Sequence, residues 1–311
     1  VFALILSSAI TVFGQGSDYE TSWAKNEIDY MKEKKILSGY PDGTFRPNNN
    51  MTKAEFYKVI NGLIGYTEKA EINFNDVKET DWFYEEVQKG VKANYIKEER
   101  FVRPNTQITR EEVARILSIV FGVEEDKEAA KKFTDYNSIP SKLRGVFGGL
   151  TKLGYISGYP DGTVRPKGKI TRAEVVKMLH NLSGEIVNVA GTYKKDVKTN
   201  MVVNTADVIL KDMTIEGNLY LTEGIGDGDI TLDNVTVKGQ LSVKGGGANS
   251  VIIRNSTINQ VVIDRQEGLV RVVFENTTVE GVKTYNEVTL ELKRGAEVKE
   301  AELDGKVQVT V

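Results

Sequence analysis

The sequence has no cysteine, and its 311 residues include a single histidine, His180. The missing cysteines exclude disulfides, iron–sulfur clusters and thiolate zinc sites, and one histidine removes most histidine-based metal or catalytic arrangements. Neither sign of charge dominates, because 41 basic residues stand against 44 acidic ones. A nucleic-acid-binding protein is expected to carry a basic face instead. We therefore expect no metal site, no cofactor and no nucleic-acid partner.

Long apolar runs are also scarce. Residues 1–13 are uncharged and mostly apolar, and the small-x-small sequence Gly14-Gln15-Gly16 follows them. This arrangement is typical of the apolar core and cleavage region of a secretory signal, although the initiator methionine and the basic region are missing. The alternatives are an apolar helix of the mature fold or a membrane anchor, but the run falls short of the ~20 apolar residues that span a bilayer. The sequence thus predicts export, a signal-peptide remnant at 1–16 and no membrane span in the mature chain.

An internal repeat organises the first half of the chain. The sequence SGYPDGTFRP at 38–47 recurs as SGYPDGTVRP at 157–166, and a degenerate copy, KEERFVRP, occupies 97–104. Proline and glycine in this segment predict a turn. Each copy is followed by Thr-x-x-Glu, a capping box that begins a helix, at Thr52, Thr109 and Thr171. Apolar residues at helical spacing lie on both sides. One helix–turn–helix unit cannot bury its own apolar helix faces, but three units can bury them against one another in a shared core. This predicts a compact α domain over about 17–184.

These units resemble the S-layer homology (SLH) domain. The resemblance rests on the turn, on the Ile-Thr-Arg-Ala-Glu type of helix start, and on an aspartate that opens each unit, followed by tryptophan in the first two. It implies an all-α, pseudo-threefold bundle of three units at 17–70, 71–130 and 131–186. It also implies that grooves between neighbouring units bind an anionic, typically pyruvylated, secondary cell-wall polysaccharide and so hold the protein on the bacterial wall without a covalent bond.

The resemblance implies that the groove arginine of the family corresponds to Arg110 and Arg172, and to Lys53 in the first unit. A guanidinium group can pair a carboxylate through two hydrogen bonds, and a helix N-terminus already favours anions. Lys53 keeps the positive charge but lacks a guanidinium group that could form two parallel hydrogen bonds, so we expect a weaker first site. The alternative is that all three are ordinary solvated helix residues.

Other groove candidates also have a structural alternative. Trp23 and Trp82 offer rings to a sugar or belong to the core, while Asp18, Asp76 and Asp135 accept sugar hydroxyls or cap helices. We expect Asp42 and Asp161 to close their own turns. The second unit lacks Gly-Tyr-Pro-Asp-Gly and the third lacks the tryptophan, so three units need not give three equal sites. The turn residues expected to line grooves are Gly39, Tyr40, Gly158 and Tyr159.

From about Val187 the pattern changes to short β-branched segments between glycines and asparagines. Similar tetrapeptides begin at Asp212, Asn234, Asn255 and Asn276, in steps of 22, 21 and 21 residues, and a weaker copy begins at Gly295. This period predicts a parallel β-solenoid over 187–311, with the asparagines either stacked as a ladder or placed at left-handed corners. An antiparallel sandwich is the alternative fold. Because Val311 falls in a strand pattern, we expect either a capped last coil or a chain that continues.

The sequence shows no recurrent acidic pair one coil apart, which would place two carboxylates at the ~5–10 Å that glycoside hydrolysis uses. We therefore predict a non-catalytic protein, secreted to the cell wall or S-layer, with other S-layer or envelope proteins as further partners. The solenoid would be a spacer, an assembly surface or a display stalk. A wall-anchored polysaccharide-degrading enzyme and a glycan-binding adhesin remain the alternatives. Acids beside a cleft with Arg or Lys would favour the enzyme, and a flat, amide- and threonine-rich face would favour a structural role.

Overall fold

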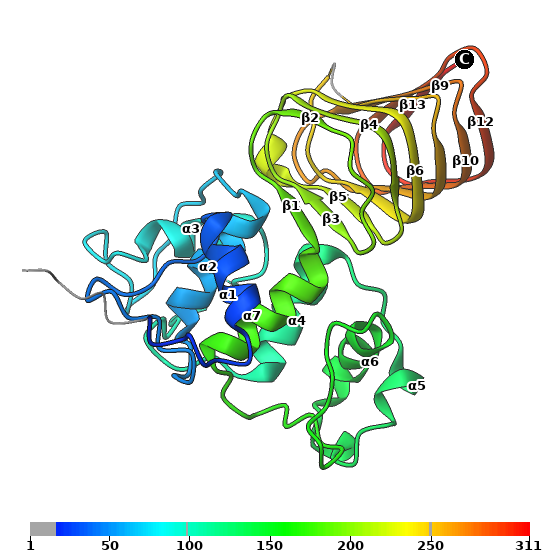
Figure 1. Cartoon of the computed structure of the whole chain (residues 1–311). Coiled ribbons are helices and arrows are strands. Elements are labelled where there is room, and N and C mark those ends of the chain that lie inside the picture. The colour runs from blue at the N-terminus through cyan, green and yellow to red at the C-terminus, as the bar shows by residue number, and fades with distance from the viewer. Residues whose placement is uncertain (1–16, 98, 249–250) are drawn as a thin grey trace, which may run out of the picture.

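The computed structural model describes residues 17–97, 99–248 and 251–311, so the predicted signal remnant at 1–16 lies outside the described residues. A helical part comes first and a β part follows it (Figure 1). Within the described ranges, no helix combines the length and the apolar character needed to cross a membrane. The helices are α1 (Lys25–Glu33), α2 (Lys53–Ile64), α3 (Tyr84–Lys92), α4 (Arg110–Phe121), α5 (Lys127–Ala130), α6 (Arg144–Lys152) and α7 (Arg172–Ser183), with 3₁₀ turns η1 (Tyr136–Ser138), η2 (Ser141–Leu143) and η3 (Glu223–Ile225).

The predicted capping boxes are confirmed at the starts of α2, α4 and α7. In α2 the Thr52 side chain accepts from the Glu55 amide, while the Glu55 carboxylate accepts from the Thr52 amide. The same pair of bonds begins α4 and α7. Each of these helices buries its predicted apolar face, including Phe56, Leu117 and Val175. Gly65 ends α2 in the left-handed region, at φ 80°, which glycine adopts without strain.

The three units are joined in a closed ring of backbone hydrogen bonds. The Met51 amide donates to the Ile170 carbonyl (3.0 Å), the Ile108 amide to the Met51 carbonyl (3.0 Å), and the Ile170 amide to the Ile108 carbonyl (3.4 Å). Around this ring α2 packs on α3, α4 on α6, and α7 on α1. The isolated antiparallel bridges at the helix starts mean that the helical part is not purely α, because its centre is held by short extended segments.

The β part is a parallel solenoid, as predicted, and the antiparallel sandwich is wrong because every strand pairing in the described ranges is parallel. Figure 1 shows the coils stacked one on the next. The strands are β1 (Glu185–Val187), β2 (Gly191–Tyr193), β3 (Met201–Val203), β4 (Val208–Ile215), β5 (Leu219–Leu221), β6 (Ile230–Val243), β7 (Val251–Arg254), β8 (Thr257–Ile263), β9 (Val270–Glu275), β10 (Thr278–Thr284), β11 (Val288–Leu292), β12 (Glu297–Leu303) and β13 (Val307–Thr310).

The repeated Asp and Asn residues do both things that the sequence allowed. Asp212, Asn234, Asn255 and Asn276 all have positive φ, between 48° and 57°, so each turns a corner in the left-handed region. Side chains also bond along part of the stack, since Asn234 Nδ2 donates to Asp212 Oδ1 (3.0 Å) and Asn276 Nδ2 to Asn255 Oδ1 (2.9 Å). The ladder is interrupted between these pairs, because Asn255 Nδ2 donates to Asp233 Oδ1 (2.9 Å). Corner geometry and stacking are thus provided by the same residue type.

The solenoid caps the C-terminal ends of the helices. Asn204 Nδ2 donates to the Leu63 carbonyl of α2 (2.8 Å), Lys244 Nζ to the Val120 carbonyl of α4 (2.8 Å), and Asn200 Nδ2 to the Leu182 carbonyl of α7 (2.7 Å). The last carbonyls of a helix have no partner within the helix, so the solenoid supplies bonds that the helices lack. Only Gly184 separates α7 from β1, and we conclude that the two parts form one packed body without a linker.

Replacing Asn200 tests this interface. Its Nδ2 also donates to Tyr155 Oη (2.6 Å), and its Oδ1 accepts from the Asn218 amide (2.8 Å). We expect Asn200→Ala to lower the free energy of unfolding by about 2–3 kcal/mol, because buried groups lose their partners. Urea unfolding followed by tryptophan fluorescence and by circular dichroism measures this loss.

Both tryptophans lie in the helical part, so fluorescence reports that part alone, and coincident transitions are expected for one packed body. The exposed Lys198→Ala is the control, with a change below about 0.5 kcal/mol. Two separate transitions in the unchanged protein would contradict the shared interface.

Candidate functional site

At each junction between units, the basic residue after the capping threonine meets the capping-box glutamate of the next unit. We name these the 1–2, 2–3 and 3–1 junctions after the units they join. The order is cyclic, as in the backbone ring. The pairs are Lys53 Nζ with Glu112 Oε1 (2.5 Å), Arg110 Nη1 with Glu174 Oε1 (3.5 Å) and Arg172 Nη1 with Glu55 Oε1 (3.6 Å).

At the 3–1 junction Arg172 is buried, with 3% of its surface exposed. Its Nε donates to the Phe45 carbonyl (2.8 Å) and its Nη2 to the Ser38 carbonyl (3.0 Å). The guanidinium group lies 4.7 Å from the centre of the Tyr40 ring. Arg172 therefore holds the turn of the first unit through two backbone carbonyls and the Tyr40 ring. The alternative of a solvated helix residue is wrong for this position.

The 2–3 junction repeats the arrangement. Arg110 is also buried, and its Nε donates to the Val164 carbonyl (2.9 Å) and its Nη2 to the Ser157 carbonyl (3.3 Å). Its guanidinium group lies 4.9 Å from the centre of the Tyr159 ring. Both junctions thus bring together an arginine and a tyrosine that lie far apart in the sequence.

A second guanidinium group covers each tyrosine and was missed by sequence reasoning. Arg46 lies 4.3 Å from the centre of the Tyr40 ring, and Arg165 lies 4.1 Å from that of Tyr159. Both arginine side chains are exposed, at 42% and 52%. The signal was their shared place before proline in the repeated turn. Each tyrosine hydroxyl donates to a capping-box glutamate, Tyr40 to Glu55 (2.6 Å) and Tyr159 to Glu174 (2.8 Å).

The opening aspartates clamp the turn of their own unit. Asp18 Oδ1 accepts from the Phe45 amide (2.6 Å) and Oδ2 from the Arg46 amide (2.7 Å), and Asp76 and Asp135 make the same pair of bonds. Arg46 has φ 57°, so the clamp fixes a conformation that non-glycine residues rarely adopt. The helix-cap alternative is wrong, since α1, α3 and α6 begin after Ala24, Phe83 and Leu143. Asp135 precedes the 3₁₀ turn η1, but its side chain makes no cap bond there.

Asp42 and Asp161 close their own turns, as predicted. Asp42 Oδ1 accepts from the Thr44 hydroxyl (2.6 Å) and the Thr44 amide (3.0 Å). These bonds and the nearby Arg46 lower the pKa of Asp42 to about 2, so Asp42 is charged at neutral pH. Gly39 and Gly158 are required by space, because a Cβ would lie 2.7 Å from the Thr44 carbonyl oxygen or 2.9 Å from that of Thr163.

The 1–2 junction differs from the other two. Lys53 takes the place of the arginine, and the second unit has no tyrosine in its turn. Burial opposes ionisation of Glu112, but hydrogen bonds from Lys53 and Thr109 outweigh it and lower the pKa of Glu112.

Trp82 is 57% exposed, with the Lys58 ammonium 5.8 Å from its ring, and Trp23 is 62% exposed. The core alternative is therefore wrong for both tryptophans.

Comparison with known proteins agrees with this repeat architecture. The model of the S-layer homology domain matches residues 17–56, 73–114 and 132–176. The chain is 32% identical over 172 residues to an amylopullulanase of Thermoanaerobacterium thermosulfurigenes (53% of this chain, 9% of that protein). It is 30% identical over 160 residues to a cellulosome-anchoring protein of Acetivibrio thermocellus (47% and 34%), and 26% identical over 289 residues to an S-layer protein of Bacillus licheniformis (81% and 31%).

The chain therefore carries three S-layer homology domains, followed by a β-solenoid. It spans about a tenth to a third of the length of these three relatives. The domains and the S-layer relatives assign it to the cell wall or S-layer.

The burial of Arg172 leads to a stability prediction. Arg172→Ala removes the donors to two carbonyls and leaves the half-buried Glu55 without its cation, so we expect a loss of about 3 kcal/mol in the free energy of unfolding. The exposed Arg46→Ala should cost less than about 1 kcal/mol. Urea unfolding compares the two. Equal losses would show that Arg172 does not hold the junction.

Proposed function

We propose that this protein is a non-catalytic anchor that binds an anionic secondary cell-wall polysaccharide, pyruvylated in the typical case, at the 2–3 and 3–1 junctions of a pseudo-threefold bundle. The observation that carries the proposal is a repeated cluster in which one tyrosine ring is contacted by a buried and by an exposed guanidinium group. Two matched clusters fit a polymer with a repeated acidic unit. The similarity to a cellulosome-anchoring protein agrees with an anchoring role.

Each part of this cluster has a chemical task. Arg46 uses Nε on the Thr44 hydroxyl and Nη2 on Asp42, and Nη1 has no protein partner among the described residues. That edge of the guanidinium group is available to a ligand carboxylate, which would form a charge-assisted hydrogen bond. Arg165 has the same arrangement with Thr163 and Asp161. The buried Arg172 and Arg110 add positive charge next to the two tyrosine rings.

The remaining candidates support this contact. Trp23 and Trp82 are exposed and offer faces to sugar rings, and Asp18, Asp76, Asp135, Gly39 and Gly158 keep the turns in shape. Lys53 gives the 1–2 junction a positive charge, but this junction has neither a guanidinium group in that position nor a tyrosine. It is therefore the weakest site. The solenoid, with no linker before it, is a rigid extension whose face carries the stacked Thr214, Thr236, Thr257 and Thr278.

Binding of the full chain to purified wall sacculi tests the proposal. Arg46→Gln combined with Arg165→Gln should weaken binding at least about tenfold, because it removes the exposed guanidinium groups and leaves the buried ones in place. Mild acid that strips ketals and secondary polymer from the sacculi should abolish binding of the unchanged protein. Co-sedimentation measures both effects.

The matched control is Lys198→Gln with Arg294→Gln, two exposed cations of the solenoid, which should bind normally. Urea unfolding confirms that each variant is folded. If binding survives both the acid treatment and the loss of Arg46 and Arg165, the proposed chemistry of the junctions is wrong.

A further inference from the structure

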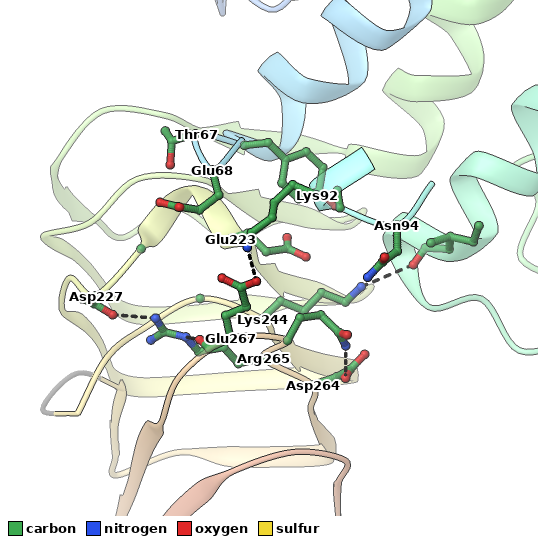
Figure 2. Close-up of a pocket in the computed structure, with 16 residues that line it drawn as sticks. Thr67, Glu68, Lys92, Asn94, Glu223, Asp227, Lys244, Asp264, Arg265 and Glu267 are labelled. Atoms are coloured by element: carbon green, nitrogen blue, oxygen red, sulfur yellow. Dashed lines mark hydrogen bonds and ion pairs between the residues drawn. The ribbon is translucent and has the colours of Figure 1, made fainter. Parts of the chain in front are cut away.

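A separate pocket lies where the helical part meets the solenoid. Its volume is about 430 Å³, and residues 66–68 after α2, residues 92–94 at the end of α3 and several solenoid corners line it. This volume lies within the range of about 300–1,000 Å³ that is typical of small-molecule sites. Figure 2 shows Lys92 and Asn94 from the helical side facing Lys244 and Asp264 from the solenoid side. None of these residues belongs to the junctions between units, and we call this cavity the interface pocket.

Most charged side chains of the interface pocket are satisfied by one another. Arg265 Nη2 pairs with Asp227 Oδ1 (2.6 Å), and Lys92 pairs with Glu267 across the two parts of the chain. A charged ligand would have to compete with these ion pairs.

The two buried acids also disfavour a charged ligand. Glu223 Oε2 is enclosed, so Glu223 belongs to the wall of the pocket and does not reach a ligand. Burial raises the pKa of Glu223 and of Asp264, which favours the neutral form of both acids. No group of three or more acidic or histidine side chains in the described ranges is placed to hold a metal ion. The chemistry of the pocket is therefore that of uncharged hydrogen-bonding groups.

Asp264 is the acid that remains open to a ligand. It is half-buried, and Gln266 (2.7 Å) and Asn286 (2.8 Å) both donate to its Oδ1. Its Oδ2 has no hydrogen-bond partner among the described residues and, unlike Glu223 Oε2, it is not enclosed. A carboxyl oxygen in this position accepts a hydrogen bond whether the group is ionised or neutral.

Donors and an apolar surface lie in the same lining. Lys244 Nζ donates to the carbonyl groups of Val120 (2.8 Å) and Ile119 (3.5 Å), and its ammonium group has a third hydrogen. The side-chain amide of Asn94 is exposed and has no partner in the part of the chain that the structure describes. The Ile119 side chain, which is also exposed, adds an apolar contact.

We propose that the interface pocket binds an uncharged sugar, with Asp264 Oδ2 as the partner of one ring hydroxyl and with Asn94 and Lys244 as further partners. Each sugar hydroxyl both donates and accepts, so it can use a carboxyl oxygen, an amide and an ammonium group in turn. The C–H groups of the ring can lie on Ile119. A few polar groups beside an apolar surface are typical of small-molecule sites.

The same lining argues against hydrolysis of the bound sugar. Hydrolysis of a glycoside needs two working carboxyl groups. Asp227 and Glu267 are paired with cations, Glu223 is enclosed, and Glu68 is exposed at the rim. Asp264 is therefore left without a second acid, and the acids beside Lys244 and Arg265 fit binding better than the enzyme alternative.

Titration of the full chain with matched monosaccharides tests the proposal. Glucose and N-acetylglucosamine are the uncharged probes, while glucosamine and glucuronate are related sugars that carry a positive or a negative charge. We expect the backbone amide signals of residues 94, 226 and 244–245 to shift with an uncharged sugar at concentrations at least about tenfold lower than with either charged one, because burying a charge is costly. No shift with either uncharged sugar, or equal or tighter binding of a charged one, would overturn the proposal.

Cellotetraose and chitotetraose identify the source of the sugar. A pocket that holds one ring of a polysaccharide should bind a tetramer at least about tenfold more tightly than the monomer, a gain of about 1.4 kcal/mol from contacts of the other rings at the rim. Equal affinities would identify a free sugar as the ligand. Either result supports sugar binding at this pocket.

Variants from both sides of the pocket test the assigned partners. Asp264→Asn keeps the acceptor for Gln266 and Asn286 but puts an amide donor in place of Oδ2, so sugar binding should weaken at least about tenfold. The midpoint temperature of unfolding should change by less than about 3 °C. Asn94→Gly removes the amide and tolerates the positive φ of this residue (60°), and it should also weaken binding. Normal sugar binding in both variants would overturn the assignment.

The matched control is Asp229→Asn, an exposed solenoid acid outside the interface pocket, which should leave sugar binding unchanged. The double variant Arg46→Gln with Arg165→Gln should keep the shifts at residues 94, 226 and 244–245, because its changes lie at the junctions between units. Failure of the sugar test would therefore leave the wall-anchoring proposal intact.

Discussion

The capping-box glutamate is the group on which the helical part depends. Glu55 accepts from the Thr52 amide at the start of its own helix, from the Tyr40 hydroxyl of its own turn, and lies within ion-pair distance of Arg172 from the preceding unit in the ring. A residue that usually completes one helix end here joins a helix, a turn and a neighbour. Because Glu112 and Glu174 occupy the same place, the same three glutamates begin the helices and pair with the neighbouring units.

Local signals in the sequence predicted most of the architecture. The Thr-x-x-Glu spacing, the Pro-Asp-Gly turn and the 21–22-residue period each describe contacts within a few residues or between successive coils, so the helix starts, turns and solenoid could be derived. The aspartate clamp could not, because Asp18 bonds to amides 27 and 28 residues away. Nothing in the period identifies such a contact.

The candidate site was predicted by position and only partly by role. Arg110 and Arg172 do lie at junctions between units, but they face inward to carbonyl oxygens, while Arg46 and Arg165 carry the exposed guanidinium groups. Likewise Asn200 and Asn204 look like ordinary solenoid corners in the sequence, yet their amides bond to helix ends. Which side of a repeat faces a neighbour depends on the packing of whole units, and the sequence of one unit does not contain that information.

The closed ring also limits how this molecule can vary. A linear array of repeats can lose or gain a member at its end and keep its remaining interfaces, because each repeat contacts only its neighbours. Here the third unit bonds back to the first, so removing one unit would break two interfaces and leave a cation and a glutamate unmatched. The middle unit, whose turn lacks Gly-Tyr-Pro-Asp-Gly, still supplies Ile108 to the ring and Glu112 to Lys53. Its indispensable contribution is geometric closure, and its surface is free to diverge while the count of three stays fixed.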